Sequence, residues 1–312
     1  MIEWLADDDG ILLRRDALLA GVDDKALAHS VRAGRIVRLR QGAYALRPRW
    51  DEADAVGRHR LLVSAVRQQY RGEDVALSHV SACLEQGGPS WRLDLSHAHL
   101  THLDGRGGRR GARIVHHHGE CLVGDLTRDA AGWVTSPTRT ALDTASTAER
   151  EPAVAVLDWY LHNGLTTSED LAEGFRRMTT WPHTLALQIA VRLADGSAES
   201  VGETRTRLLL RDQRLPQPVP QFEVFHPSGR LAGRVDFAWP EQRTMLEFDG
   251  KEKYLRFRRP GESIEEAVLR EKRREDQLRE LTGWTMVRLT WADLDMPQAT
   301  AARIRRAFRV AA

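Results

Sequence analysis

The sequence predicts a multidomain protein of mixed α+β or α/β class, arranged as three segments over residues 1–50, 51–193 and 197–312. Three observations support this prediction. The chain has 312 residues, which is too long for one ordinary hydrophobic core. Apolar residues change along the chain between helical spacing and strand-like alternation. The stretch Asp195-Gly-Ser-Ala is the best candidate for a linker before the last segment.

Composition narrows the class of protein. A hydrophobic content of 42% with 29% charged residues is ordinary for a folded domain and excludes a disordered chain. The net charge is only +2, so local groups of cations must carry any binding to nucleic acid. The cysteines Cys83 and Cys121 lie far apart, which excludes a disulfide scaffold. The start MIEWLADDDG has no signal-peptide pattern, and no apolar run reaches membrane-spanning length; we expect a cytoplasmic protein with no membrane partner.

The first segment has the order of a winged helix-turn-helix. Residues 11–19 are predicted to form a short helix, and Asp23 is a suitable N-cap for a second helix over 24–33. Gly34 follows that helix, where a glycine commonly ends one. Residues 36–44 alternate between apolar and polar side chains and predict a β-hairpin.

Charge in this segment favours binding to duplex DNA. No Asp or Glu occurs between Lys25 and Arg49, while cations recur throughout. Cations on the second helix and on the hairpin are suitably placed for phosphates. The alternatives are a solvated helix face, or a winged fold that contacts only proteins. The residues predicted to bind DNA here are Lys25, Arg32, Arg35, Arg38 and Arg40.

The middle segment is predicted to be mixed α/β. Its apolar spacing predicts three helices and three short strands, with a glycine- and arginine-rich loop over 104–111. The helices are predicted at 51–70, 138–145 and 152–161, and the strands at 97–102, 114–118 and 133–135.

This segment also contains a group of histidines. His97 and His99 alternate and would share one strand face, which is compatible with a metal site. However, no cysteine or carboxylate accompanies them at a recognised spacing, and three consecutive histidines point to opposite faces of a strand. Structural or partner-facing histidines are therefore the preferred interpretation. The group comprises His79, His97, His99, His102, His116, His117 and His118.

The third segment alternates between helix and strand. Ser197 is predicted to cap a helix over 199–211, and Ser263 to cap a long helix that follows Pro260 and Gly261. Strands are predicted at 222–225, 234–239, 244–248 and 284–291, with a closing helix at 296–308.

Three carboxylates on these strands suggest a metal-dependent site. Asp236 lies inside an otherwise apolar strand, where an unpaired carboxylate is costly. Glu247 and Asp249 are two residues apart and project from one face. A few carboxylates with water and phosphate are how Mg²⁺ is usually held, and such an ion would polarise a scissile phosphate. Lys251 follows across Gly250 and would stabilise developing charge.

The sequences GRVDFAWPEQRTMLEFDGKEKY and EKRREDQLRELTGWTMVRLTWADL resemble the Vsr-like (very-short-patch-repair) endonuclease superfamily, over about residues 197–310. The resemblance implies a PD-(D/E)XK nuclease-like fold and a cofactor of Mg²⁺ or Mn²⁺. It matches Asp236 to the strand aspartate and Glu247, Asp249 and Gly250 to the E-x-D-G element.

The resemblance leaves some roles open. Glu203 best matches an upstream helix glutamate, with Glu199 as a substitute. One register takes Asp236, Glu247 and Asp249 as the metal ligands, with Lys251 or Lys253 as the cation. The other takes Asp249-Gly-Lys251 as a literal D-x-K. The histidine that the repair enzymes use near this point has no counterpart here.

The helix after Ser263 also has implied roles. Lys272, Arg273 and Asp276 would flank the active site, with the two cations on substrate phosphate; the alternative is an ordinary solvated helix face.

The front of the chain resembles a second family. The stretch GILLRRDALLAGVDDKALAHSVRAGRIVRLRQGAYAL resembles the N-terminal winged helix of AbiEi-type antitoxins of type IV toxin–antitoxin systems. LSHVSA and VTSPTRTALD are similar to the region that follows it, so this resemblance covers about residues 5–170. It implies binding to operator DNA, repression of the protein's own promoter, and a cognate toxin as a partner.

Two functions follow from these patterns. One is a metal-dependent endonuclease that cleaves double-stranded DNA and is positioned by its winged helix. The other is an antitoxin-like transcriptional autoregulator whose nuclease-like domain is inactive. The sequence leaves the oligomeric state open.

Overall fold

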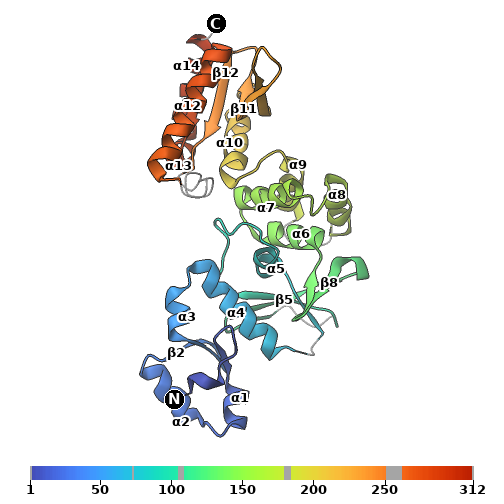
Figure 1. Cartoon of the computed structure of the whole chain (residues 1–312). Helices are drawn as coiled ribbons and strands as arrows, with labels where there is room; N and C mark the ends of the chain where they lie inside the picture. The colour runs from blue at the N-terminus through green and yellow to red at the C-terminus, as the bar shows by residue number, and fades with distance from the viewer. Residues whose placement is uncertain (1, 72–73, 105–108, 179–183, 251–261, 311–312) are drawn as a thin grey trace. The chain divides into compact units, whose positions relative to one another are not determined.

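The chain folds into two compact units, Met1–Ala194 (unit 1) and Asp195–Ala312 (unit 2) (Figure 1). The computed structural model describes residues 2–71, 74–104, 109–178, 184–250 and 262–310. Within these ranges the strands form three sheets. Unit 1 has one sheet of order β1-β3-β2 and one of order β6-β7-β5-β4-β9-β8, and unit 2 has a sheet of order β10-β11-β12-β13.

The N-terminal part of unit 1 is a helix-turn-helix followed by a hairpin. Asp23 caps the second helix by accepting a 2.8 Å hydrogen bond from the Ala26 amide, and Gly34 follows that helix with a φ of +69°. The hairpin β2–β3 is called the wing below. The elements are η1 (Glu3–Leu5), β1 (Ile11–Leu13), α1 (Arg14–Leu19), α2 (Asp24–Arg32), β2 (Ile36–Arg40) and β3 (Ala43–Leu46).

The helix predicted over 11–19 is wrong in its first three residues. Ile11–Leu13 instead form β1 and pair antiparallel with β3. Strand geometry sends Ile11 and Leu13 into one hydrophobic cluster and Leu12 into another, so all three are buried. A helix cannot divide three consecutive apolar residues between two opposed cores in this way.

Helix α4 (Ala55–Gln69) joins the winged helix to the rest of unit 1. Its buried residues, among them Leu62 and Val66, lie in one cluster with Leu39 of the wing and Leu100 of the larger sheet. The predicted boundary at residue 50 is therefore not a boundary between cores. Helix α3 (Arg47–Glu52) runs across it.

The larger sheet of unit 1 mixes parallel and antiparallel pairs. β5 pairs parallel with β7, and β4 pairs parallel with β9. The predicted strands 97–102, 114–118 and 133–135 correspond to β5, β7 and β9. The strands of this sheet are β4 (Val75–Leu77), β5 (Ala98–His102), β6 (Arg109–Gly111), β7 (Ile114–His118), β8 (Leu126–Asp129) and β9 (Gly132–Thr135).

Helices complete unit 1. The predicted helix 51–70 is interrupted at Ala53, and Asp54 begins α4 by accepting a 2.7 Å hydrogen bond from the Gly57 amide. Helices α5, α8 and α9 had no expected counterpart. The remaining elements of this unit are α5 (His79–Glu85), η2 (Val123–Asp125), α6 (Pro137–Thr147), α7 (Arg150–His162), α8 (Ser168–Arg177) and α9 (Thr184–Leu193).

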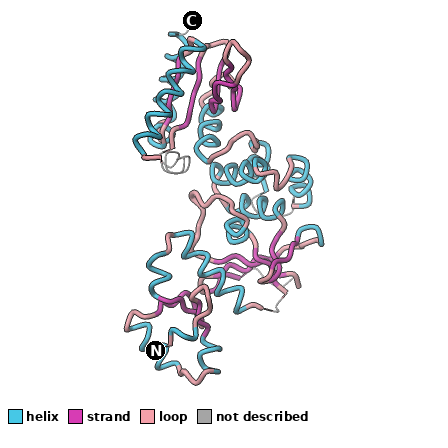
Figure 2. Tube along the Cα trace, in the orientation of Figure 1, coloured by secondary structure: helices cyan, strands magenta, loops and turns pink. Residues whose placement is uncertain are grey.

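Unit 2 begins with a helix, continues as an antiparallel meander, and returns through a second helix to a strand parallel to β12 (Figure 2). The first helix is capped by Ser200 and not by Ser197 as expected, whereas the predicted cap Ser263 forms a capping box with Glu266. The elements are α10 (Val201–Asp212), β10 (Val219–Phe225), β11 (Leu231–Trp239), β12 (Thr244–Phe248), α12 (Ile264–Thr282), β13 (Thr285–Leu289), α13 (Trp291–Leu294) and α14 (Pro297–Val310).

Helices cover both faces of this sheet. Met245 and Met286 pack with Leu278 of α12 on one face. Leu246 and Leu289 pack on the other face with Leu209 of α10 and with α14. Strand alternation therefore places Asp236 and Glu247 on the face that α12 covers. None of the described helices has the length and apolar character needed to cross a membrane.

Gly202 marks the close approach of α10 to the sheet. A Cβ atom built at Gly202 would lie 2.0 Å from Cε1 of Phe248. We expect Gly202→Ala to lower the free energy of unfolding of unit 2 by about 2 kcal/mol, because overpacking a filled core shifts its neighbours. Urea unfolding measures this change. Gly124→Ala is the control, since its Cβ would meet no heavy atom within 4 Å; equal effects of the two changes contradict the prediction.

Candidate functional site

The helix-turn-helix and the wing present an exposed basic surface. Lys25 and Arg32 of α2 and Arg38 of β2 are exposed, and we call these three side chains the basic surface. Arg14 of α1 donates two hydrogen bonds to Asp24, of 2.7 and 2.6 Å, and this pair ties the two helices together. The acidic residue nearest in sequence to the basic surface is thus engaged by an arginine.

Two of the predicted DNA-binding arginines are partly enclosed. Arg40 donates to the Gln69 side chain and, over 3.3 Å, to the Ala112 carbonyl, so it connects the wing to the rest of unit 1. Burial lowers the pKa of its guanidinium from the ordinary value. Arg35 is half-buried, and its Nε has no hydrogen-bond partner among the described residues. Arg40, which was predicted to bind DNA, is thus engaged in contacts within unit 1.

In unit 2 the strands bring two predicted site carboxylates together. The antiparallel register pairs Phe237 with Leu246, and one residue further along the same register Asp236 stands opposite Glu247. Oδ2 of Asp236 accepts a 2.7 Å hydrogen bond from the Phe248 amide. The Asp249 amide donates to the Leu289 carbonyl over 2.7 Å, which extends the sheet just past β12. Asp236 and Glu247 therefore lie on one face of the sheet, and Asp249 follows directly after β12.

Arginines from α12 and β13 occupy the space around Glu247. The Glu247 side chain is buried, and its Oε1 forms an ion pair with Nη2 of Arg274. Arg288, the neighbour of Glu247 in the parallel register, lies 3.9 Å from both Glu247 and Asp249 and forms a 2.6 Å ion pair with Glu275. Burial disfavours the charged Arg274 guanidinium, but its bonds to Glu271 and Glu247 outweigh burial, so its pKa is raised.

Glu203 is held by its own helix start and by β10. Oε1 accepts a 2.8 Å hydrogen bond from the Ser200 hydroxyl, and Oε2 accepts 2.9 Å bonds from the Glu199 amide and the Gln221 side chain. Glu199, its predicted substitute, instead pairs with Arg234. These contacts give Glu203 a role in capping α10 and fixing it to the sheet.

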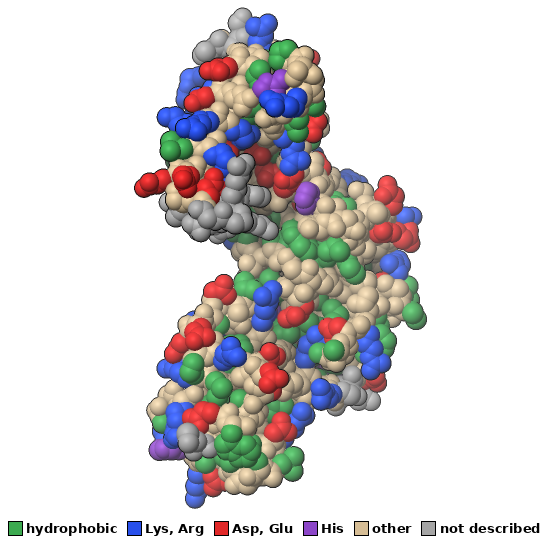
Figure 3. Space-filling view, in the orientation of Figure 1, with side chains coloured by type: hydrophobic (Ala, Val, Ile, Leu, Met, Phe, Trp, Pro, Cys, Tyr) green, Lys and Arg blue, Asp and Glu red, His purple; other side chains and the backbone are tan. Residues whose placement is uncertain are grey.

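The face that α12 turns toward the carboxylates differs from the expected one. Arg274 and Glu275 meet the sheet residues, while Lys272, Arg273 and Asp276 are exposed. On the face of unit 2 that Figure 3 shows, Lys and Arg side chains are interspersed with Asp and Glu. The inward positions precede buried Leu278 by three or four residues, and this helical spacing was the signal available in the sequence. Lys272 and Arg273 are exposed, and their contact with substrate phosphate stays a prediction.

The expected metal ligands do not converge as described. Of the described residues, three metal-ligating side chains have donor atoms within 4.8 Å of one another, and they are His79, His99 and His117. Asp236, Glu247 and Asp249 do not form such a group. Oε1 of Glu247 is engaged by Arg274 and Oε2 lies 3.9 Å from Arg288, so an ion bound through Oε1 would compete with Arg274. The expected cations Lys251 and Lys253 lie outside the described residues.

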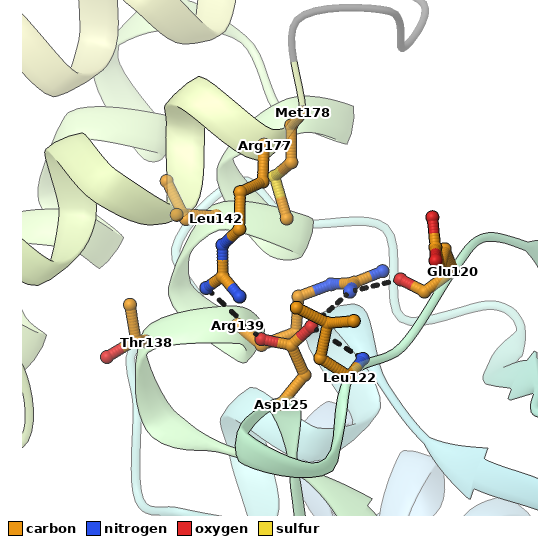
Figure 4. Close-up of a pocket in the computed structure, with 9 residues that line it drawn as sticks. Glu120, Leu122, Asp125, Thr138, Arg139, Leu142, Arg177 and Met178 are labelled. Carbon is orange, nitrogen blue, oxygen red and sulfur yellow. Dashed lines mark hydrogen bonds and ion pairs between the residues drawn. The ribbon is translucent and has the colours of Figure 1, made fainter.

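Unit 1 contains a buried polar network beside a cavity of about 370 Å³ (Figure 4). Arg139 of α6 donates to Asp125 over 3.2 Å and to Asp143 over 2.8 Å, and Arg177 of α8 reaches the other oxygen of Asp125 over 3.4 Å. Burial raises the pKa of Asp143 to about 6, although Arg139 acts in the opposite direction. The network ends at His79, whose Nδ1 lies 3.9 Å from Oδ2 of Asp143.

Several histidines of unit 1 lie close together in its interior. Burial, followed by neighbouring histidines, lowers the pKa of His99 to about 3 and that of His117 to about 4. His102 and His116 form a second pair, with 2.8 Å between ring nitrogens. His97 lies apart from the buried group, within 3.4 Å of Arg110. The strand neighbours His97 and His99 therefore do not form a common site.

Comparisons with known proteins give two findings. Residues 1–47 match a family model described as "Transcriptional regulator, AbiEi antitoxin". The chain is also 30% identical over 278 residues to the uncharacterized protein MT2308 of Mycobacterium tuberculosis strain CDC 1551 / Oshkosh, and equally to the uncharacterized protein Rv2248 of strain H37Rv. Each match covers 88% of this chain and 93% of the relative.

The ion pair around Glu247 leads to a stability prediction. Arg274→Ala leaves the buried Glu247 carboxylate without its closest cation, and we expect a loss of about 3 kcal/mol in the free energy of unfolding. Adding Glu247→Gln removes the unpaired charge and should restore part of the loss. Chemical unfolding of the single and double variants measures both effects. Additive losses in the double variant would show that the two side chains do not interact.

Proposed function

The chain belongs to the same family as the two mycobacterial proteins and carries an AbiEi-antitoxin-type regulator segment at residues 1–47, and from this premise we propose that it is a DNA-binding transcriptional regulator. The observation that carries the proposal is the basic surface. α2 and the wing present Lys25, Arg32 and Arg38 to solvent, within a stretch that contains no Asp or Glu. Cations in these positions of a winged helix neutralise duplex phosphates.

Contacts within unit 1 hold the helix-turn-helix and the wing in a fixed arrangement. Arg14 locks α1 to α2 through Asp24, and Arg40 locks the wing to Gln69 at the end of α4. The wing and α4 also share one apolar cluster. A surface held in this way meets DNA with little loss of conformational entropy. We propose autoregulation of the protein's own promoter and a toxin protein as a partner, as in AbiEi-type antitoxins.

The basic surface gives a binding prediction. Lys25→Ala, Arg32→Ala and Arg38→Ala should each weaken binding to DNA from the protein's own promoter and flatten the salt dependence by about one unit of slope per lost phosphate contact. Gel-shift titrations at several salt concentrations measure both quantities. Arg176→Ala is the matched control, since Arg176 is an exposed arginine of α8. Unchanged binding in all three variants contradicts the proposal.

A second candidate function is DNA cleavage by unit 2. It is favoured by Asp236 and Glu247 standing opposite each other on neighbouring strands with Asp249 two residues further. The resemblance to Vsr-like endonucleases is a further argument for this candidate. Against it stands the ion pair between Glu247 and Arg274, which occupies a carboxylate that the reaction needs. We therefore place this candidate second.

Plasmid nicking separates the two functions. If unit 2 is a nuclease, supercoiled plasmid is nicked with Mg²⁺ or Mn²⁺ and not with EDTA, and Asp236→Ala and Glu247→Ala abolish nicking. Lys272→Ala serves as the control, because Lys272 is exposed and lies off the carboxylate face. If unit 2 is inactive, as we expect from the Arg274 contact, no nicking occurs with either ion. Nicking that is lost only in the carboxylate variants would reverse our order of the candidates.

A further inference from the structure

Three histidines from separate elements meet in the interior of unit 1. His79 begins α5, His99 lies in β5 and His117 lies in β7. Each offers a ring nitrogen, and these atoms all lie within 4.8 Å of one another. We call these residues the histidine trio. His79 and His99 are nearly enclosed, with 4% and 9% of their surface exposed.

The rings of the trio are in direct contact. Nδ1 of His99 and Nε2 of His117 are 2.9 Å apart, and the His79 ring stacks on His117 with 3.5 Å between centroids and 13° between planes. Three imidazoles packed so closely cannot all carry a proton charge, because like charges repel strongly in a buried site. Nδ1 of His79 also lies 2.9 Å from Oγ of Ser78. Neutral imidazoles are the form that binds metal ions, and an ion would replace the hydrogen bond between His99 and His117.

A carboxylate oxygen lies beside the trio without a hydrogen bond. Asp143 is fully buried, and its Oδ1 accepts from Arg139. Its Oδ2 has no hydrogen-bond partner within the described part of the chain, and it lies 3.9 Å from Nδ1 of His79. A buried carboxylate oxygen left in this state costs free energy, and a nearby cation would offset that cost.

We propose that His79, His99 and His117 form a binding site for a divalent transition-metal ion of the zinc class, with the Asp143 carboxylate beside it. Nitrogen ligands with one carboxylate suit Zn²⁺ and related ions, whereas Mg²⁺ and Ca²⁺ prefer oxygen alone. The proposal is independent of the function of either unit.

The distances between the ring nitrogens of the histidine trio show how the rings must move when a metal ion binds. Two nitrogens bound tetrahedrally to zinc at about 2.1 Å lie roughly 3.4 Å apart, so His99 and His117 need to separate only slightly. A metal ion lies in the plane of each imidazole that binds it. The stack of His79 on His117 must therefore open, and the His79 ring must turn. The environment of all three rings changes on binding, which gives a direct spectroscopic test.

Cobalt is the first probe of the site. The full-length protein is stripped with EDTA and titrated with Co²⁺, and visible absorption reports a nitrogen-rich tetrahedral site. We expect saturation at one Co²⁺ per chain and displacement by Zn²⁺. His99→Gln and His117→Gln should each weaken binding by at least about 100-fold. His118→Gln, an exposed neighbour on β7, is the matched control and should bind as the parent does.

A second measurement uses only the parent protein, so it does not require that the variants fold. Zn²⁺ is added to the stripped parent protein, and nitrogen NMR spectra of the imidazole rings are recorded. We expect the resonances of His79, His99 and His117 to shift together while those of His118 stay in place. Absence of saturable Co²⁺ binding, unchanged binding in both Gln variants, or an unshifted trio would each overturn the proposal and leave the rings as a packing stack.

Discussion

Buried charges need opposite charges, and this constraint organises both units. In unit 1 Arg139 of α6 joins Asp143 of the same helix and Asp125 of η2, and the second contact fixes α6 to η2. In unit 2 Arg274 of α12 joins Glu247 of β12, and Arg288 of β13 joins Glu275 of α12. The Arg139–Asp125 and Arg274–Glu247 pairs connect separate elements and lie 14 and 27 residues apart in the sequence. Because an unpaired charge in the same place costs several kcal/mol, by order of magnitude, these contacts restrict how the helices pack on the sheets.

Local signals in the sequence were sufficient for part of this structure. The caps at Asp23 and Ser263 and the strand Thr244–Phe248 depend on neighbours within a few residues, and each is found where it was expected. The strand Ile11–Leu13 was not predictable in this way, since its three buried side chains are divided between two clusters built from distant residues.

The candidate sites likewise combine features that local sequence predicts with features that depend on distant residues. Alternation placed Asp236 and Glu247 on one sheet face, which follows from strand geometry alone. The rotation of α12 about its axis decides that Arg274, and not Lys272, contacts these carboxylates. Leu278 fixes this rotation because it packs against the sheet. His79 was not expected beside His99, because no pattern predicted α5. Residue spacing within one segment cannot predict contacts between side chains that come from separate helices and strands.

The pairing of charges also bears on which unit binds nucleic acid. Phosphate contacts need cations that are exposed and not already neutralised, as Lys25, Arg32 and Arg38 are exposed on α2 and the wing. The arginines nearest the carboxylates of unit 2 are engaged with Glu247, Glu271 and Glu275. A divalent ion bound through Oε1 of Glu247 would compete with Arg274. At the histidine trio the rings are neutral and one Asp143 oxygen lacks a hydrogen bond, so an ion would gain ligands without displacing an arginine. The same constraint that argues against an ion at Glu247 therefore favours one at His79, His99 and His117.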